Sequence, residues 1–329
     1  MAKSETKRTQ KSRAIILAIL NAVILILLII LIVIVMKRDT YSTVKKEPVI
    51  EVQTGTDTEP NTQTETEEDP LKEILPEKTY GSWDLDSLSK EEVPYGNNPD
   101  KTTTAGIPEG VFYYKSLWGK YRAEFVSQLA FDYNAGTSTD KSIYLTFDCS
   151  TDSPETGKIL DILKEKKVAA TFFITGEYYD THKDIVSRMI KEGHRIGSMG
   201  KSGKSLTGLS LDKQKEEILD VVNKLQDDYG YDCRLFRFPT WGFTEQSLAL
   251  VDNLGLKSVF WSYTYTDTGT APLSLEEAYE KAVKYLHPGA VYSMRANSSV
   301  SRELLGKWID AVYEKGYDFA GVYPVEAFE

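Results

Sequence analysis

Histidine and cysteine are scarce in this chain of 329 residues. The histidines are His182, His194 and His287, and the cysteines are Cys149 and Cys233. So few cysteines exclude a disulfide-stapled scaffold and a cysteine-rich zinc module. Positive charge is also in deficit, because the formal net charge is −10, and we expect no nucleic-acid partner. The hydrophobic content of 41% indicates a globular protein.

The longest apolar run lies near the N-terminus. Between Ala14 and Met36 the only polar residue is Asn21. As a helix with a rise of about 1.5 Å per residue, the run would span roughly 35 Å, enough for a hydrocarbon core of ~30 Å. The alternative is a cleaved signal peptide, but the run is long for one, and Lys37 and Arg38 follow in place of a small-residue cleavage site. We expect residues 14–36 to be a transmembrane helix.

The charges around this run predict its orientation. Five basic residues precede the run, in residues 1–13, and four follow it, in residues 37–46, which is a weak positive-inside bias. We expect residues 1–13 to form a cytoplasmic tail. The main domain then lies outside the cell, held at the cell membrane by a single span.

Residues 37–79 have the composition of a solvated stalk. No aromatic residue occurs from Ser42 to Thr79, and the stretch from Glu51 to Asp69 carries seven acidic residues and no basic one. Such a segment cannot bury enough apolar area to offset its ordering entropy. We expect a disordered acidic tether that lets the following domain reach a nearby wall.

Aromatic residues return abruptly at Tyr80 and recur up to Tyr121. Because large aromatics supply much of the buried area of a core, we expect residues 80–140 to form an ordered extension packed on the main domain. A helix is predicted around Lys115–Gln128.

From residue 141 to the end at 329, apolar runs alternate with amphipathic stretches. The expected strands are Ser142–Asp148, Ala169–Thr175, Arg195–Ser198, Leu235–Phe238, Lys257–Tyr263, Ala290–Met294 and Asp318–Val322. The expected helices are Glu155–Lys166, Lys183–Glu192, Ser210–Tyr229, Thr244–Asn253, Leu275–Leu286 and Ser301–Glu314. This alternation predicts an α/β fold with a parallel sheet, either closed as a TIM-like barrel or open and doubly wound. In both, functional side chains follow the strand ends.

Five short motifs stand at these strands. They are YLTFD at 144–148, AATFFITG at 169–176, GHRIG at 193–197, FRFP at 236–239 and PGAVY at 288–292. In this order and spacing the set resembles the polysaccharide deacetylase family with its NodB homology domain, most of all the branch acting on N-acetylmuramic acid in peptidoglycan. The resemblance covers about residues 141–322 and implies the (β/α)7 barrel of that family.

The resemblance also implies a chemistry, the removal of an acetyl group from an N-acetyl sugar. In that family a divalent metal such as zinc, held by an acidic or amide residue and two histidines, polarises the amide carbonyl and activates water. An aspartate serves as base and a histidine as acid. These residue types are needed because a bound metal lowers the pKa of water to about 7 and stabilises the developing oxyanion.

Several positions match the pattern of the family. Asp148 falls on the catalytic base, and Arg237 and Pro239 fall on the third motif, in which Trp241 replaces a glycine. Asp267 falls on an acidic position after the fifth strand. The resemblance therefore implies a catalytic position for Asp148, supporting positions for Arg237 and Asp267, and substrate contacts for Pro239 and Trp241.

The metal and acid positions are degenerate. Cys149 stands where relatives carry Asp or Asn, and Met199 and Gly203 replace the two histidine ligands. Arg295 replaces the catalytic histidine, and guanidinium does not titrate in proteins. A general base alone contributes about 10²–10⁴-fold, and without a metal both the electrophile and the water activator are lost. We therefore expect no cofactor and an inactive enzyme.

None of the histidines falls on a ligand or acid position. His194 precedes the ligand motif and is expected to be structural. His182 stands at a helix start and His287 at a helix end, so we expect both at the surface or in capping roles.

The cysteines and methionines allow three interpretations. Cys149 is a candidate nucleophile, although no partner histidine is evident. Cys149, Met199 and Met294 are candidates for a soft-metal site, although methionine is far more often a packing residue. A Cys149–Cys233 disulfide is not expected, because the two residues should lie at opposite ends of a parallel sheet.

The preferred interpretation of the site is electrostatic. We expect Asp148 to be neutralised by Arg295 or Arg237 in a closed-over site, because a buried carboxylate needs a cationic partner. Two tyrosines in strand-end loops, Tyr263 and Tyr265, join Trp241 as candidate sugar-stacking residues, with filling of the emptied pocket as the equal alternative.

Two functions follow from these expectations. The first is a pseudoenzyme, a membrane-tethered barrel that binds cell-wall glycan of the peptidoglycan kind or an envelope protein without hydrolysis. The alternative is an active peptidoglycan or polysaccharide N-deacetylase with an atypical metal site, which would need a divalent metal such as zinc.

Overall fold

The structure is a computed structural model in which residues 80–95, 119–123, 131–132, 137–138, 141–240, 242–267 and 272–322 are described. The chain divides into two units, Met1–Glu68 and Asp69–Glu329, and every described residue belongs to the second. The cytoplasmic tail, the transmembrane helix and the stalk, predicted over residues 1–79, lie outside the described residues. Among the helices that are described, none is both long and apolar enough to cross a membrane.

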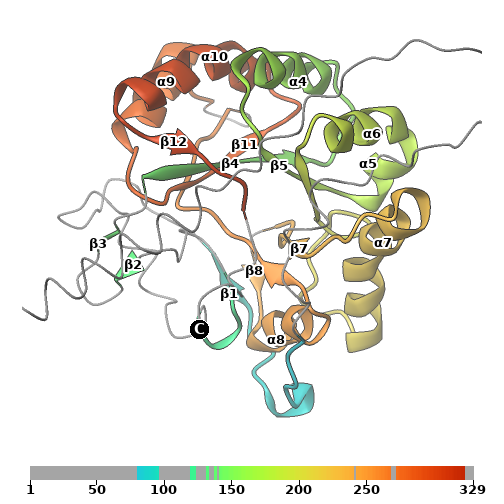
Figure 1. Cartoon of the computed structure of the whole chain (residues 1–329). Coiled ribbons are helices and arrows are strands. Elements are labelled where there is room, and N and C mark those ends of the chain that lie inside the picture. The colour runs from blue at the N-terminus through green and yellow to red at the C-terminus, as the bar shows by residue number, and fades with distance from the viewer. Residues whose placement is uncertain are drawn as a thin grey trace, which may run out of the picture. The chain divides into compact units, whose positions relative to one another are not determined.

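A parallel sheet organises the second unit (Figure 1). Along its main path the strands follow in the order β10 (Tyr263–Thr264), β11 (Val291–Arg295), β4 (Ser142–Cys149), β5 (Thr171–Ile174), β6 (Arg195–Ser198), β7 (Leu235–Phe236) and β9 (Lys257–Ser258). An eighth strand, β12 (Asp318–Phe319), pairs with the first residues of β4. All these pairings are parallel, as the strand–helix alternation predicts.

The sheet is curled because one stretch of chain supplies both of its edges. Ser258 ends β9, which pairs with β7, and Tyr263 begins β10, which pairs with β11. These two residues are five steps apart, at most about 18 Å of extended chain. A flat sheet of seven strands would hold its edges roughly 29 Å apart at ~4.8 Å per strand. The predicted α/β fold with a parallel sheet is confirmed, and the sheet forms a curled half barrel. The run Lys257–Tyr263, expected as one strand, is divided between two short strands.

Helices lie on the outer side of the curled sheet (Figure 1). They are α4 (Glu155–Lys166), α5 (Gly176–Thr181), α6 (Lys183–Lys191), α7 (Leu211–Tyr229), α8 (Glu245–Asn253), α9 (Leu275–Lys284) and α10 (Ser299–Glu314). The predicted N-cap of α7 is confirmed, since the Ser210 hydroxyl accepts a hydrogen bond from the backbone N–H of Lys213. The short helix α5 was not predicted, because six residues carry too little periodicity.

The strands divide the core into two clusters. Along β4, Phe147 and Cys149 pack with the helices that cover the sheet, whereas Tyr144 belongs to a second cluster on the other face. Thr146 and Asp148 alternate with the first pair and point with Tyr144 toward the inside of the curl. This alternation places the Asp148 carboxylate on the concave face.

Several described residues of the extension contact α8 and β8 (Gly242–Phe243). Strand β1 (Val93–Pro94), which follows the 3-10 turn η1 (Leu85–Ser87), pairs antiparallel with β8. The Trp83 indole N–H donates to the buried Asp252 carboxylate at 2.6 Å. Of the helix predicted over Lys115–Gln128, only residues 119–123 are described. Residues 119–120 are helical, and residues 121–122 form a turn in which Arg122 has a φ of 50°. Elsewhere in the extension, β2 (Phe131–Asp132) pairs antiparallel with β3 (Thr137–Ser138).

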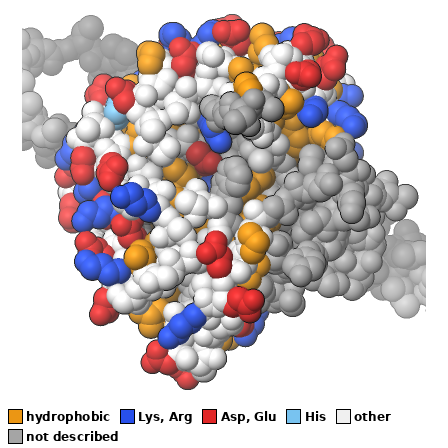
Figure 2. Space-filling view, turned by 180° about the vertical axis from the view of Figure 1, so that it is seen from behind, with side chains coloured by type: hydrophobic (Ala, Val, Ile, Leu, Met, Phe, Trp, Pro, Cys, Tyr) orange, Lys and Arg blue, Asp and Glu red, His pale blue; other side chains and the backbone are white. Residues whose placement is uncertain are grey.

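Acidic and basic side chains are intermixed over the described part of the face in Figure 2. Many form ion pairs in which at least one partner is exposed, such as Lys213–Glu216 at 2.7 Å. Such pairs contribute at most about 1 kcal/mol each. The stability of the fold therefore comes chiefly from the two apolar clusters.

Candidate functional site

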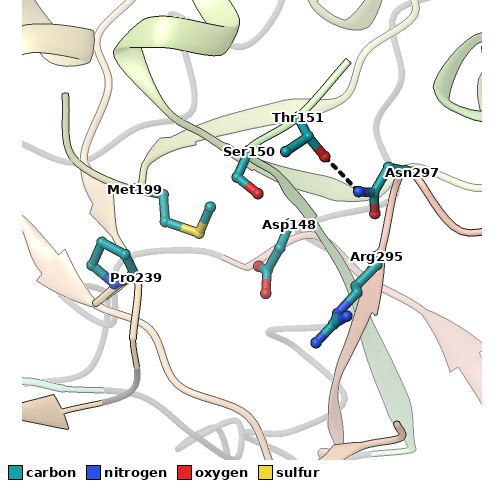
Figure 3. A pocket seen from close by; sticks show the side chains of 7 residues that line it. All are labelled: Asp148, Ser150, Thr151, Met199, Pro239, Arg295 and Asn297. Atoms are coloured by element: carbon teal, nitrogen blue, oxygen red, sulfur yellow. Dashed lines mark hydrogen bonds between the residues drawn. The ribbon is translucent and has the colours of Figure 1, made fainter. Parts of the chain in front are cut away.

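A pocket of about 200 Å³ opens at the carboxyl ends of the strands (Figure 3). Asp148 comes from the end of β4 and Arg295 from the end of β11, and these two residues are paired across the strands. The other lining residues follow strand ends and are Ser150, Thr151, Met199, Pro239 and Asn297. The pocket therefore lies at the carboxyl ends of the parallel strands, where functional side chains were expected.

Asp148 is bound through both carboxylate oxygens. Its Oδ1 accepts a hydrogen bond from Arg237 Nη1 at 2.7 Å, and its Oδ2 accepts one from the Ser293 hydroxyl at 3.2 Å. The Asp148 side chain is 17% exposed and that of Arg237 is fully buried. The cationic partner of Asp148 is thus Arg237, and the site is an open pocket where a closed-over one was expected.

Arg237 is fixed from several sides. Its Nε donates to the Val259 carbonyl at 3.1 Å, and its Nη1 donates to the Thr146 hydroxyl at 2.8 Å. The guanidinium also lies 4.0 Å from the centre of the Phe173 ring. Burial lowers the pKa of Arg237, and the neighbouring Asp148 charge acts in the opposite direction. The pair therefore holds the Asp148 carboxylate in one orientation.

Arg295 has its own acidic neighbour. Its Nε lies 3.6 Å from Oδ1 of Asp267, whose side chain is 1% exposed, whereas the Arg295 side chain is 38% exposed. Oδ2 of Asp267 accepts a hydrogen bond from the Ser301 hydroxyl at 3.5 Å, and that hydroxyl lies 2.8 Å from the Tyr265 hydroxyl. Asp267 is thereby anchored behind Arg295, and the guanidinium lies at the wall of the pocket.

The residues at the degenerate positions do not fit a catalytic metal. Cys149 is buried on the helix-covered face of the sheet, away from Asp148. Gly203 has a φ of +66°, and a β-carbon there would lie 2.9 Å from Cγ2 of Thr175. Over the part of the chain that the structure describes, no group of three His, Cys, Asp or Glu side chains is close enough to hold a metal ion. The residues at these positions therefore do not support a metal-dependent reaction step.

The sulfur residues do not converge either. Burial raises the pKa of the Cys149 thiol well above its ordinary value, which opposes a nucleophilic role. Cys149 and Met294 project from the helix-covered face of the sheet, whereas Met199 lines the pocket with Asp148, so the sheet separates the candidate soft-metal ligands. Cys149 and Cys233 are both buried and form no disulfide, as expected.

Each histidine has a role away from Asp148. Nδ1 of the buried His194 accepts a hydrogen bond from the Ala170 backbone N–H at 3.2 Å, which confirms a structural role. His182 stands between α5 and α6, and its Nε2 lies 2.6 Å from Asp152. His287 is fully buried and contacts the Ser262 hydroxyl at 2.9 Å. The expectation of a surface or capping role was wrong for His287, which is a buried residue in contact with Ser262.

The aromatic candidates lie outside the pocket lining or outside the described residues. Tyr263 and Tyr265 are 2% and 8% exposed. The Tyr263 ring packs 4.8 Å from that of Tyr292 and 5.4 Å from that of Tyr285. This burial favours the packing alternative for both tyrosines over sugar stacking. Trp241 is not among the described residues, and its substrate contact remains a prediction.

Polar residues that sequence reasoning missed complete the pocket. Ser150 and Thr151 directly follow β4, and Asn297 follows β11. The Asn297 side-chain amide donates a hydrogen bond to the Thr151 hydroxyl (Figure 3). Their position just beyond strand ends was the available signal, but it is shared by many solvent-facing loop residues.

The chain is similar to known carbohydrate-active proteins. A family model described as polysaccharide deacetylase matches residues 135–259. An uncharacterised 30.6 kDa protein of Geobacillus stearothermophilus is 36% identical over 186 residues, which is 56% of this chain and 70% of that protein. The peptidoglycan-N-acetylmuramic acid deacetylase PdaA of Bacillus subtilis is 32% identical over 189 residues, which is 57% of this chain and 72% of PdaA.

Solved structures agree with this relationship. The structure of Bacillus subtilis PdaA, a family 4 carbohydrate esterase, matches with a TM-score of 0.64 and 29% identity, covering 71% of this chain and 96% of that one. A CE4 family pseudoenzyme from Bacillus anthracis shares the fold, with a TM-score of 0.53 and 20% identity over 56% of this chain and 64% of its own. On these sequence and structural matches, the chain belongs to the polysaccharide deacetylase family.

Proposed function

We propose that this protein is a membrane-anchored, extracytoplasmic pseudoenzyme that binds cell-wall glycan in the pocket around Asp148 without hydrolysing it. The observation that carries this proposal is the donor set at the degenerate positions. Met199 and Gly203 replace imidazoles, and Cys149 lies on the opposite face of the sheet. No side chain there can supply the nitrogen ligands that a hydrolytic zinc site needs.

Without a metal, the residues that remain in the pocket would accelerate hydrolysis only a little. Asp148 keeps a carboxylate in the pocket, and a positioned base is worth about 10²–10⁴-fold. Removing one oxyanion-stabilising group typically costs ~3–4 kcal/mol of transition-state stabilisation. Arg295 cannot replace the lost acid, because its guanidinium has no proton to transfer near neutral pH. Binding is therefore favoured over turnover.

The lining of the pocket suits a sugar. Hydroxyls of Ser150 and Thr151 and the amide of Asn297 offer donors and acceptors to sugar hydroxyls, beside the apolar edges of Met199 and Pro239. At about 200 Å³ the pocket is smaller than the ~300–1,000 Å³ of sites for drug-sized ligands. It fits one saccharide unit of a longer chain. The name of PdaA, which refers to N-acetylmuramic acid in peptidoglycan, supports a wall glycan as that chain.

Two measurements on the purified full chain in detergent test the loss of catalysis. The first is elemental analysis for bound zinc, and the second is release of acetate from peptidoglycan fragments. We expect neither stoichiometric zinc nor acetate above background. Stoichiometric zinc together with turnover that disappears in Asp148→Asn would instead establish an active deacetylase with an atypical metal site.

Retention on purified cell wall tests the binding. Asn297→Ala removes an amide from the pocket lining, and we expect the retained fraction to fall several-fold. Asn223→Ala, an exposed position on α7, is the matched control and should bind like the wild type. Equal retention of all three proteins would place glycan binding elsewhere or exclude it. Trp241→Ala tests, in the same assay, the stacking role predicted from the sequence.

A further inference from the structure

One residue of the extension, Tyr95, reaches the inside of the curled sheet. It directly follows β1, is 4% exposed, and belongs to the same apolar cluster as Tyr144 and Phe173 of the concave face. Its ring packs 4.7 Å from that of Trp261, nearly at a right angle, and 4.9 Å from that of Phe260. A residue that precedes the barrel in the sequence is therefore part of the core of the barrel.

The polar end of Tyr95 binds the segment that links the two edges of the sheet. This segment, residues 259–262, runs from β9 to β10, and the Tyr95 hydroxyl donates a hydrogen bond to its Trp261 carbonyl. At the two ends of the segment, the N–H groups of Val259 and Ser262 donate to carbonyls of β7 and β11. Tyr95 therefore holds the middle of a segment whose ends are held by the sheet.

The same segment holds the cation at the base of the pocket. Arg237 Nε donates to the Val259 carbonyl at 3.1 Å, and Nη2 donates to the Phe260 carbonyl at 3.2 Å. Nη1 of the same guanidinium donates to Asp148 Oδ1 at 2.7 Å. The carbonyl that Tyr95 binds is the next one along the chain. Because a guanidinium carries its donors in a rigid planar fork, a shift of these carbonyls would also turn the donor that faces Asp148.

The extension also contacts a second wall of the pocket. Strand β1 pairs antiparallel with β8, so that Pro94 lies opposite Gly242 (Figure 1). Strand β8 follows shortly after Pro239, which lines the pocket. The few residues that end at Tyr95 are therefore attached both near the side of the pocket and under its base.

We propose that Tyr95 is a positioning residue for the pocket, which fixes the backbone at residues 259–261 and thereby orients Arg237 and the Asp148 carboxylate. This inference rests on the proposed glycan-binding function and concerns the control of that site. Ligand binding and docking of the extension are then linked, because both stabilise the same arrangement of Arg237, and such linkage is reciprocal. A glycan in the pocket should tighten the extension, and loss of the Tyr95 hydroxyl should weaken glycan binding.

Hydrogen–deuterium exchange of the full chain in detergent tests the link. In the wild type, soluble peptidoglycan fragments should slow exchange several-fold in the pocket segments 148–153 and 293–297 and also in residues 81–95. In Tyr95→Phe, which keeps the ring and removes the hydrogen bond, residues 81–95 should no longer respond, and the fraction retained on cell wall should fall several-fold. A variant that had only lost stability would keep the response in its folded fraction. Tyr313→Phe, the same change at an exposed tyrosine of α10, is the matched control and should behave like the wild type.

A comparison without ligand tests the positioning role independently of glycan binding. In Tyr95→Phe the N–H groups of Val259 and Ser262 should exchange roughly tenfold faster, because the buried Trp261 carbonyl has lost a donor. Unchanged exchange there would overturn the positioning role. Fragments that protect the pocket segments of the wild type but not residues 81–95 would overturn the link and leave glycan binding intact. Protection of neither region would overturn the proposed function and the link, while the comparison without ligand would still decide the role of Tyr95.

Discussion

Arg237 and Asp148 show how a charged pair survives at the base of an open pocket. The arginine is buried under its hydrogen bonds to a hydroxyl and backbone carbonyls, while the aspartate remains partly hydrated. Because the partners are unequally buried, removing either one has unequal consequences. Loss of Asp148 would leave a buried cation, and loss of Arg237 would leave an anion that water reaches.

Arg237→Gln should destabilise the fold. The change removes the cation beside Asp148 and leaves the Thr146 hydroxyl and the Val259 carbonyl without their donor. Breaking a buried pair typically costs about 3–5 kcal/mol, and the partial exposure of Asp148 places the expected loss near the lower end. Urea unfolding of the wild type and the variant measures it. Lys213→Gln, which breaks only the exposed pair with Glu216, should cost less than about 1 kcal/mol, and equal losses in the two variants would contradict this account.

The buried histidines should make stability fall in mild acid. Burial lowers the pKa of His194 and of His287 from 6.5 to about 4. Between these values the unfolded chain binds more protons than the folded one, so the free energy of unfolding decreases as the pH falls from about 6.5 toward about 4. Urea midpoints at a series of pH values should show this decrease.

A variant that keeps one hydrogen bond of each histidine isolates the titration. His194→Asn can present an oxygen near the position of Nδ1, and His287→Gln can reach the Ser262 hydroxyl from the position of Nε2. The double variant should have a flatter stability profile between pH 4 and 6.5. A profile as steep as that of the wild type would assign the acid sensitivity to other groups.

At the scale of elements, the loop after β6 is shaped by two glycines and by contacts with α7. Gly200 and Gly203 both have positive φ, at +80° and +66°. The Ser202 backbone N–H and hydroxyl both bind the Glu217 carboxylate of α7, at 2.9 Å and 3.0 Å. The backbone conformation at position 203 therefore favours glycine. The Glu217 carboxylate on the neighbouring helix holds the loop in this conformation.

Restoring histidines to this loop should not restore a metal site. In Met199→His with Gly203→His, the second side chain would be strained by about 1 kcal/mol at positive φ and would meet Thr175 at 2.9 Å. Cys149 would still supply no ligand from the far face. We expect the double variant to bind zinc no more tightly than the wild type in a competition assay with a zinc-binding dye. Stoichiometric zinc in the variant at micromolar concentrations would show that the loop adapts.

The whole molecule combines a pocket domain with an N-terminal region predicted to hold it at a membrane. Trp83 and Arg122, from separate parts of the extension, both donate to Asp252 of α8. The chain that leads from the predicted stalk is therefore attached to the domain on the side of α8, through a buried carboxylate. That chain acts as a tether only if the apolar run from Ala14 to Met36 spans the membrane.

The predicted anchor has a direct test in cells. The full chain should remain in the membrane fraction after washing at high salt and alkaline pH, because about 23 apolar residues span the hydrocarbon core. Deletion of residues 14–36 should release the protein into the soluble fraction. External protease added to spheroplasts should degrade the domain but not a tag fused to residue 1. A protected domain would reverse the proposed orientation.

Local signals in the sequence determined much of the fold. The predicted helix Glu155–Lys166 and strand Arg195–Ser198 match α4 and β6 at both ends, because apolar spacing and flanking turn residues act over a few residues. The Ser210 cap was predicted for the same reason. The ordered motifs were sufficient to identify the family, since each lies within one strand and the residues next to it.

Tertiary structure decided what depends on distant contacts. It split the run from Lys257 to Tyr263 between the two edges of the sheet, buried His287 against Ser262, and chose Arg237 over Arg295 as the partner of Asp148. It also brought Asn297 beside Thr151, 146 residues earlier in the chain. Sequence spacing cannot predict such pairs, because the curl of the sheet sets which strand ends meet and which side chains share the concave face.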